Sequence, residues 1–281
     1  MGYFRPLVMS VLKNENDIKE RVRIFDEIER FIFLAFRISQ TRSNYQDSIF
    51  YNAARELEHK VIKLTDISAK INEALKDYFI GEIGEGVFKI NSFSEFINKK
   101  FTMGDKAGFY RWYGLHYFLF EYELSLYEQR GGKAAVDWDV LKNTPKDKIS
   151  VEHIYPQTPD HEYWKLKFPV SESHNMHLYQ GSLGNLLLLS SAVNSSLQND
   201  SFEEKKKEKV NDKGVKVRSG YSEGSFSEIE VSKYDEWTPE KVKWRGIILL
   251  KFMQMKWKIK FHSNKTENEV LILKLLNFPE E

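Results

Sequence analysis

The chain has 281 residues, of which 41% are hydrophobic and 30% charged, a balance typical of a globular protein that excludes a disordered chain. It contains no cysteine, which excludes disulfides and cysteine-ligated zinc sites and agrees with the cytoplasmic location that we expect. The formal net charge is only +1, so any surface that binds nucleic acid must come from local clustering of basic residues. No apolar run approaches the length of a membrane span, and we expect no membrane partner.

The first part of the chain shows the periodicity of amphipathic helices, with apolar residues recurring at spacings of three and four. The expected helices lie at 15–38, 48–63, 66–79, 92–101 and 108–128. No constellation of catalytic residue types accompanies these patterns. We therefore interpret residues 1–147 as a helical domain with a packed core.

The pattern changes after residue 147, and we assign residues 148–281 to a second domain. Its expected elements are strands at 148–154 and 183–189, and helices after Ser190-Ser191, at 200–210 and at 238–257. The first strand alternates in polarity, and the second is a continuous apolar run. The sequence thus predicts an α+β protein that is mainly helical.

The residue types that phosphodiester hydrolysis requires occur together in this second domain. The reaction needs a base that activates water and a group that neutralises charge on the phosphate. A histidine side chain ordinarily titrates near neutral pH, so His153 suits the base, and Glu152 precedes it on the expected strand. Asn185 and, nine residues later, Asn194 offer amide groups. A pair of strands followed by a helix can bring these four side chains together, with oxygen atoms for a divalent cation.

These residues also carry a resemblance to a known family. The segments EHIYPQ (152–157) and LGNLLLL (183–189), Asn194 and the F-x-x-K at 202–205 resemble the HNH (ββα-metal) nuclease superfamily. The pattern is most like the C-terminal nuclease domain of GmrSD-type, modification-dependent restriction proteins, over residues 148–258. The resemblance implies a ββα-metal fold and a metal-dependent DNA endonuclease that serves a bacterial system against phage or modified DNA.

The resemblance also implies a role for each matching residue. His153 would be the general base, and Asn185 would hold the His153 ring and its loop in place. Glu152 and Asn194 would bind the metal, and their oxygen atoms favour magnesium or manganese over zinc. Lys205 is expected to contact a phosphate at the active site.

A run of basic residues follows Lys205, and it has two interpretations. Lys206, Lys207 and Lys209 ordinarily indicate a solvated helix face. Beside a nuclease motif, the same run suits contact with DNA phosphates, which positions DNA without reading its sequence. We predict that these three lysines bind DNA.

Each motif residue also has an ordinary structural explanation. His153 could be a histidine at a strand end, Asn185 a turn residue after Gly184, and Asn194 a surface amide. Two further functions stay open. One is an inactive module that holds DNA through the lysines, which the weak ligand Asn194 would favour. The other is a structural partner whose helical half docks a sensor subunit.

Relatives of this kind carry an additional N-terminal domain that resembles ParB-type nucleotide-binding domains. We find no glycine-rich phosphate loop or acidic triad in its place here. We therefore expect that domain to reside in a separate chain, or to be missing because the sequence is a fragment or one half of a split gene.

Overall fold

The structure is a computed structural model, and it describes residues 2–76, 88–89, 92–102, 108–130, 149–168 and 173–278. Contacts between residues divide the chain into two compact units. Unit 1 consists of Met1–Glu95 and Met253–Leu271, and unit 2 of Phe96–Phe252 and Ile272–Glu281. The domain boundary that we predicted, between residues 147 and 148, lies outside the described residues.

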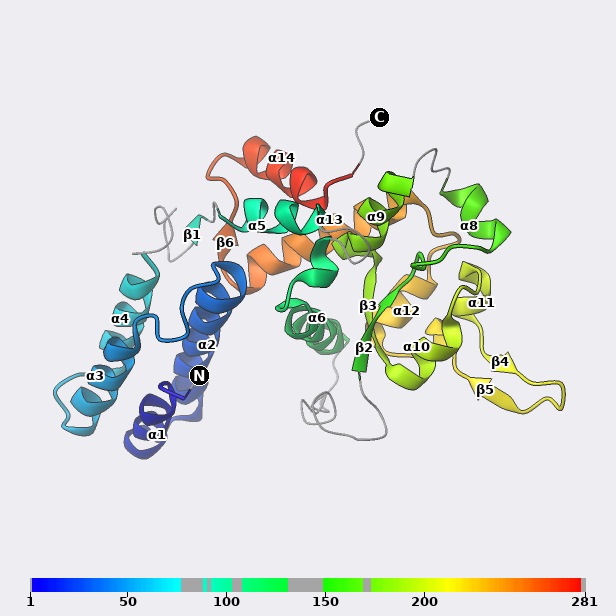
Figure 1. Ribbon diagram of the computed structural model, residues 1–281. Coiled ribbons are helices and arrows are strands. Elements are labelled where there is room, and N and C mark those ends of the chain that lie inside the picture. Colours follow the sequence, from blue (N-terminus) through cyan, green and yellow to red (C-terminus); the bar gives the residue numbers. More distant parts are fainter. Residues whose placement is uncertain are drawn as a thin grey trace. The chain divides into compact units, whose positions relative to one another are not determined.

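Amphipathic helices form most of the described part of unit 1 (Figure 1). They are α1 (Arg5–Asn14), α2 (Ile18–Ile32), α3 (Asp47–Glu58) and α4 (Leu64–Lys76). The last two correspond to the predicted helices, whereas α1 was not predicted. Helix α1 packs along α3, and α2 packs against α4. The buried rings of Phe4 and Phe31 both contact that of Phe50, with centroid distances of 4.5 and 4.8 Å.

The helix that we predicted over residues 15–38 begins at Ile18 and changes from an α-helix to a π-helix at Phe33. Helix α2 begins after Asp17, whose side chain accepts a hydrogen bond from the backbone N–H of Lys19. It continues as a π-helix, η1 (Phe33–Ile38), in which Ser39 N donates to Leu34 O. Almost every side chain of η1 is buried. A surface α-helix typically buries one face, whereas η1 is apolar and buried on nearly all sides. Strand β1 (Phe88–Lys89) pairs in parallel with β6 (Ile259–Lys260).

Helix α6 (Leu115–Gln129) contributes much of the interior of unit 2. Its buried residues are Leu115, Phe118, Leu119, Phe120, Glu121 and Tyr122. These residues point to more than one side of the helix, so α6 is buried on more than one side. It packs against helix α12 (Phe226–Ser232) and strand β3 (Leu186–Ser190). In place of the single helix predicted over 108–128, the structure has the 3₁₀ helix η2 (Gly108–Arg111), a turn and then α6. Helix α5 (Ser92–Phe101) has the bounds that we predicted.

Two antiparallel strands followed by a helix form the part of unit 2 that carries the motif residues (Figure 1). Strand β2 (Ile149–His153) pairs with β3 so that His153 lies opposite Leu186 and Ile149 opposite Ser190. Helix α10 (Ser191–Leu197) follows β3 directly. Helices α8 (Glu162–Lys167) and α9 (Ser173–Gly181) lie between the two strands in sequence.

The predicted strand at 183–189 begins later than expected. Its first residues form a 3₁₀ turn, η3 (Leu183–Asn185). The turn lies directly on helix α13 (Pro239–Lys256), because a Cβ at Gly184 would be 1.9 Å from the carbonyl oxygen of Val242. Only glycine permits this close approach.

The segment after α10 departs furthest from the prediction. The helix expected over 200–210 is a short one, α11 (Phe202–Lys206), with a capping box of Ser201 and Glu204. The chain then forms a hairpin of β4 (Lys209–Val210) and β5 (Lys216–Arg218), followed by η4 (Tyr221–Glu223). Gly214, with φ of 72°, makes the hairpin turn. Helix α14 (Lys265–Leu276) follows the helix that we predicted to be the last.

A second core lies beneath β2 and β3. It includes the buried aromatic rings of Tyr155, Trp164, Phe168, Phe202 and Trp237. Phe202, which opens α11, is fully buried in this core. Among the described helices, none combines the length and the apolar character needed to span a bilayer.

Candidate active site

Strand β2 directs its alternating side chains toward two sides, and His153 is its last residue. Ser150 and Glu152 share one side, and His153 lies on the other. An open, largely polar pocket of about 540 Å³ surrounds this end of the strand. Glu152, His153 and Asn194 all line it, together with Tyr110 and Ser150. The structure thus brings the predicted base and both predicted metal ligands to one pocket.

The imidazole of His153 lies against an aromatic ring from the helical part of unit 2. Its centroid is 4.6 Å from that of Tyr110 in η2, and the two rings are tilted by 44°. The His153 residue is 8% exposed, so only part of it reaches solvent. This contact restricts the orientation of the ring that we predicted to be the general base.

The carboxylate of Glu152 is nearly buried, and it takes part in a network of hydrogen bonds. Its Oε1 accepts from Lys205 Nζ at 2.6 Å and from the Tyr221 hydroxyl at 3.1 Å. Lys205 Nζ also donates to the carbonyl oxygens of His153 and Ile154, each at 3.1 Å. Burial and the nearby Glu152 raise the pKa of Tyr221, so its hydroxyl remains a donor.

The position of Lys205 corrects one expectation. We predicted that it contacts a phosphate, but its side chain is fully buried. The ammonium group has three N–H donors, and it bonds to three protein oxygen atoms. Because α11 packs into the core through Phe202, it carries Lys205 beneath β2 rather than toward solvent. Lys205 therefore neutralises Glu152 and holds the end of β2.

Asn194 lies on α10, which packs against β2. Its Nδ2 donates to Ser150 Oγ at 2.8 Å, on the side of the strand that also carries Glu152. The hydrogen bonds of Asn194 and Glu152 described above involve Nδ2 and Oε1, respectively. The remaining Oδ1 and Oε2 atoms are hard oxygen donors of the kind that magnesium and manganese prefer. The chemistry of these two atoms suits such a metal, although the described residues contain no cluster of three His, Cys, Asp or Glu side chains.

Asn185 supports the site from beneath and is fully buried. Its Oδ1 accepts from Tyr155 N at 2.7 Å, and its Nδ2 donates to Tyr155 O at 3.0 Å. Trp237 Nε1 donates to the same Oδ1 at 3.2 Å. The amide thus acts as a strand partner for the backbone that follows His153. Arg245 holds η3 from the other side by donating to the carbonyls of Gly184 and Leu186, each at 2.8 Å.

The predicted DNA-binding lysines differ from one another. Lys206 is mostly covered, with its Nζ donating to Tyr234 O at 3.1 Å and paired with Glu203. Lys207 and Lys209 are largely exposed, with side-chain exposures of 73% and 53%. Their ion pairs with acidic neighbours are surface contacts of small energy. Lys206 therefore serves a structural contact, and the other two remain accessible to a polyanion.

Sequence reasoning assigned no role to Tyr110 or Tyr221, and no local signal marks either. Ser150 could have been found, because it lies two residues before Glu152 and so faces the same side of the strand. Trp237 and Arg245 belong to the C-terminal part of the family resemblance, but their contacts with the Asn185 turn were not anticipated.

Glu228 on α12 gives a prediction about stability. Burial raises the pKa of its carboxyl to about 7. The folded protein then binds more protons than the unfolded chain between about pH 4.5 and 7, so stability falls as pH rises through this window. The loss reaches about 3 kcal/mol above pH 7, in order of magnitude.

The Glu228→Gln variant should lack this loss and melt at a higher temperature than the unmodified protein at pH 8, but not at pH 4.5. Glutamine can still accept the hydrogen bond from Ser225 N at the start of α12. Thermal melts across this pH range provide the measurement. Curves that stay parallel for the two proteins would contradict the raised pKa.

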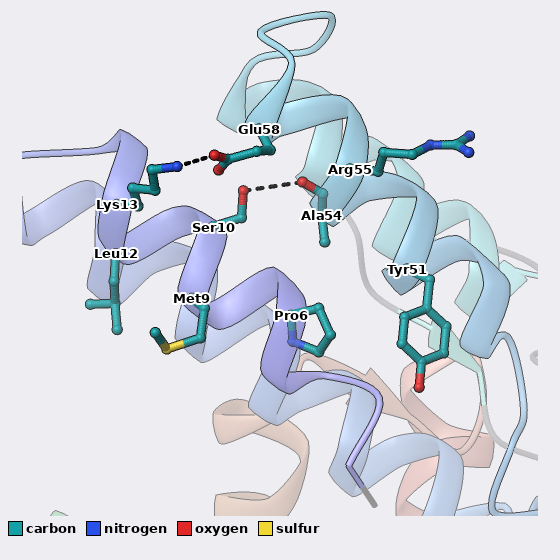
Figure 2. Close-up of a pocket in the computed structure, with 9 residues that line it drawn as sticks. All are labelled: Pro6, Met9, Ser10, Leu12, Lys13, Tyr51, Ala54, Arg55 and Glu58. Carbon is teal, nitrogen blue, oxygen red and sulfur yellow. Dashed lines mark hydrogen bonds and ion pairs between the residues drawn. The ribbon is translucent and has the colours of Figure 1, made fainter.

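A larger pocket, of about 690 Å³, lies between α1 and α3 in unit 1 (Figure 2). Its lining is mainly apolar and includes Met9 and Leu12. Ser10 Oγ donates to Ala54 O at 3.1 Å, and Lys13 pairs with Glu58 at its rim. None of the predicted site residues lines it. Glu152, His153 and Asn194 line the smaller, polar pocket of unit 2 instead.

Comparisons with known proteins agree with this assignment of the site to unit 2. Neither the curated proteins nor the solved structures contain a match to the chain. Residues 91–252, more than half of the 281 residues, match the family described as "GmrSD restriction endonucleases, C-terminal domain". The matched region includes η2, both strands of the site, α10, α11 and η4. The chain belongs to the family of GmrSD restriction endonuclease C-terminal domains.

Proposed function

We propose that unit 2 is a metal-dependent DNA endonuclease of the ββα-metal (HNH) class. The main support is the convergence of Glu152, His153 and Asn194 on one pocket, on two antiparallel strands followed by a helix. Membership in a restriction endonuclease family independently supports a nuclease function. The reaction is hydrolysis of a phosphodiester bond in DNA.

In the proposed mechanism His153 accepts a proton from the attacking water. The imidazole lines an open pocket that water and a phosphate can enter. Tyr110 restricts the ring, and Asn185 fixes the backbone that follows it. Because the base is already held in position, less translational and rotational entropy is lost in reaching the transition state than with a freely moving base.

Glu152 and Asn194 are the proposed ligands of a divalent metal, through one carboxylate oxygen and one amide oxygen. When bound, a magnesium or manganese ion supplies positive charge that offsets the charge on the phosphate in the transition state. Two protein ligands leave room for water and phosphate oxygens. Lys205 holds Glu152 in place by donating a hydrogen bond to its Oε1.

Contacts with the DNA backbone are proposed for Lys207 and Lys209. Both side chains are largely exposed and belong to the segment that follows α11. Their contribution should be independent of base sequence and should weaken as salt concentration increases.

Plasmid nicking tests the proposal directly. The purified protein is incubated with supercoiled plasmid and magnesium, manganese or a chelator, and nicked and linear products are measured. Cleavage that requires the metal and stops in chelator is expected. DNA retention without cleavage under every metal condition would overturn the enzyme and support the alternative, an inactive DNA-binding module. Asn194 favours that alternative, because an amide is a weaker metal ligand than the usual histidine.

The biological setting is part of the same proposal. The family description supports a role in a restriction system. We propose that the nuclease acts in the cytoplasm against phage or modified DNA. A ParB-like domain, in another chain or another segment, would then supply nucleotide-dependent control.

A further inference from the structure

A tyrosine that lies outside the nuclease motif contacts the proposed metal ligand. Tyr221 is fully buried in η4, and its hydroxyl donates to Glu152 Oε1 at 3.1 Å. The two residues are 69 positions apart in sequence. Their contact therefore depends on the packing of η4 beneath β2.

The segment around Tyr221 is held firmly in place. η4 packs against α11 and α12. A Cβ at Gly220 would lie 2.3 Å from the Lys206 carbonyl oxygen, so the chain passes the end of α11 closely enough that a side chain at this position would clash. Arg218, just before it, donates to Lys207 O and pairs with Asp200 at 2.6 Å. The tyrosine hydroxyl consequently has a fixed position.

Lys205 and Tyr221 contact the same oxygen of Glu152 but have different properties. The lysine ammonium carries a full charge on a flexible stem, and it neutralises the buried carboxylate. The phenol hydroxyl is uncharged and sits on a rigid ring, so it fixes direction more than charge. Two donors on Oε1 prevent the carboxylate from turning, which leaves Oε2 as the oxygen available to the pocket that Glu152 lines.

We propose that Tyr221 is a positioning residue for metal binding, which orients Glu152 so that one carboxylate oxygen is presented to the ion. This inference rests on the proposed function, because it takes Glu152 as a metal ligand. Groups that orient a metal ligand through hydrogen bonds typically change metal affinity by about 10–100-fold when they are removed.

The test is manganese binding by the full chain without DNA, measured by titration calorimetry. Tyr221→Phe removes one hydroxyl and keeps the ring that packs in the core. The matched control is Tyr122→Phe, because the buried Tyr122 hydroxyl donates to another glutamate of unit 2, Glu230 Oε1, at 2.8 Å. Circular dichroism and thermal melting verify that both variants fold.

Tyr221→Phe should weaken manganese binding about tenfold or more, and Tyr122→Phe should leave it within about twofold. In plasmid nicking, the manganese concentration for half-maximal rate should rise by the same factor for Tyr221→Phe. An affinity of Tyr221→Phe within twofold of the unmodified protein would overturn the positioning role and leave the proposed nuclease intact. Equal weakening by both variants would also overturn it. Absence of manganese binding by the unmodified protein would overturn the metal site and this inference with it.

Discussion

The His153→Ala variant is expected to nick supercoiled plasmid about 10²–10⁴ times more slowly than the unmodified protein, as is typical when a general base is lost. His153 ends β2 in the polar pocket, beside the proposed metal ligands. Alanine cannot take the proton from water, so the barrier to attack on the phosphate rises. The rate is measured from the loss of supercoiled plasmid at saturating magnesium or manganese.

The fold of this variant should change little, because the residues that hold the site make their contacts without the imidazole. Asn185 and Lys205 bind the backbone around His153. Its melting temperature should therefore stay close to that of the unmodified protein. His59→Ala, which removes an exposed imidazole from unit 1, is the matched control. Equal nicking rates for His153→Ala and the control would refute the role of His153 as the base.

The Lys205→Met variant should lose about 3–5 kcal/mol in free energy of unfolding of unit 2, as is typical when one partner of a buried ion pair is removed. Lys205 and Glu152 are 0% and 6% exposed in their side chains, with Nζ and Oε1 2.6 Å apart. Methionine fills much of the same volume but leaves a carboxylate without its charge partner. Chemical denaturation, followed by the fluorescence of the tryptophans, measures the loss.

Two further variants make this prediction specific. Lys207→Met is the matched control, because the Lys207 side chain is 73% exposed and its Nζ lies 3.7 Å from Glu203 Oε2. This variant should lose less than about 1 kcal/mol in free energy of unfolding. Combining Lys205→Met with Glu152→Gln also removes the buried carboxylate that would otherwise lack its charge partner. The double variant should therefore recover part of the lost free energy of unfolding. Equal losses for the two single lysine variants would mean that Lys205 is one of several solvated charges.

Local patterns in the sequence determined several elements near the site. Alternating polarity over 148–154 predicted β2, because side chains of a strand point alternately to its two sides. Capping serines after an apolar run predicted the helix that carries Asn194. Such signals involve neighbours within one turn or one strand, so a single sequence contains them. The motif spacing also indicated that Glu152, His153 and Asn194 belong to one site, and the pocket brings them together.

Only the tertiary structure decided what surrounds those residues. Lys205 and Lys207 are two positions apart in one basic run, yet packing buries the first and exposes the second. Tyr110 and Tyr221 reach the site from segments far from the motif in sequence. The break of the predicted strand at Asn185 likewise depends on the close approach of α13 to Gly184. Burial and long-range hydrogen bonds arise when distant segments pack together, and the periodicity of a single segment contains no signal for that.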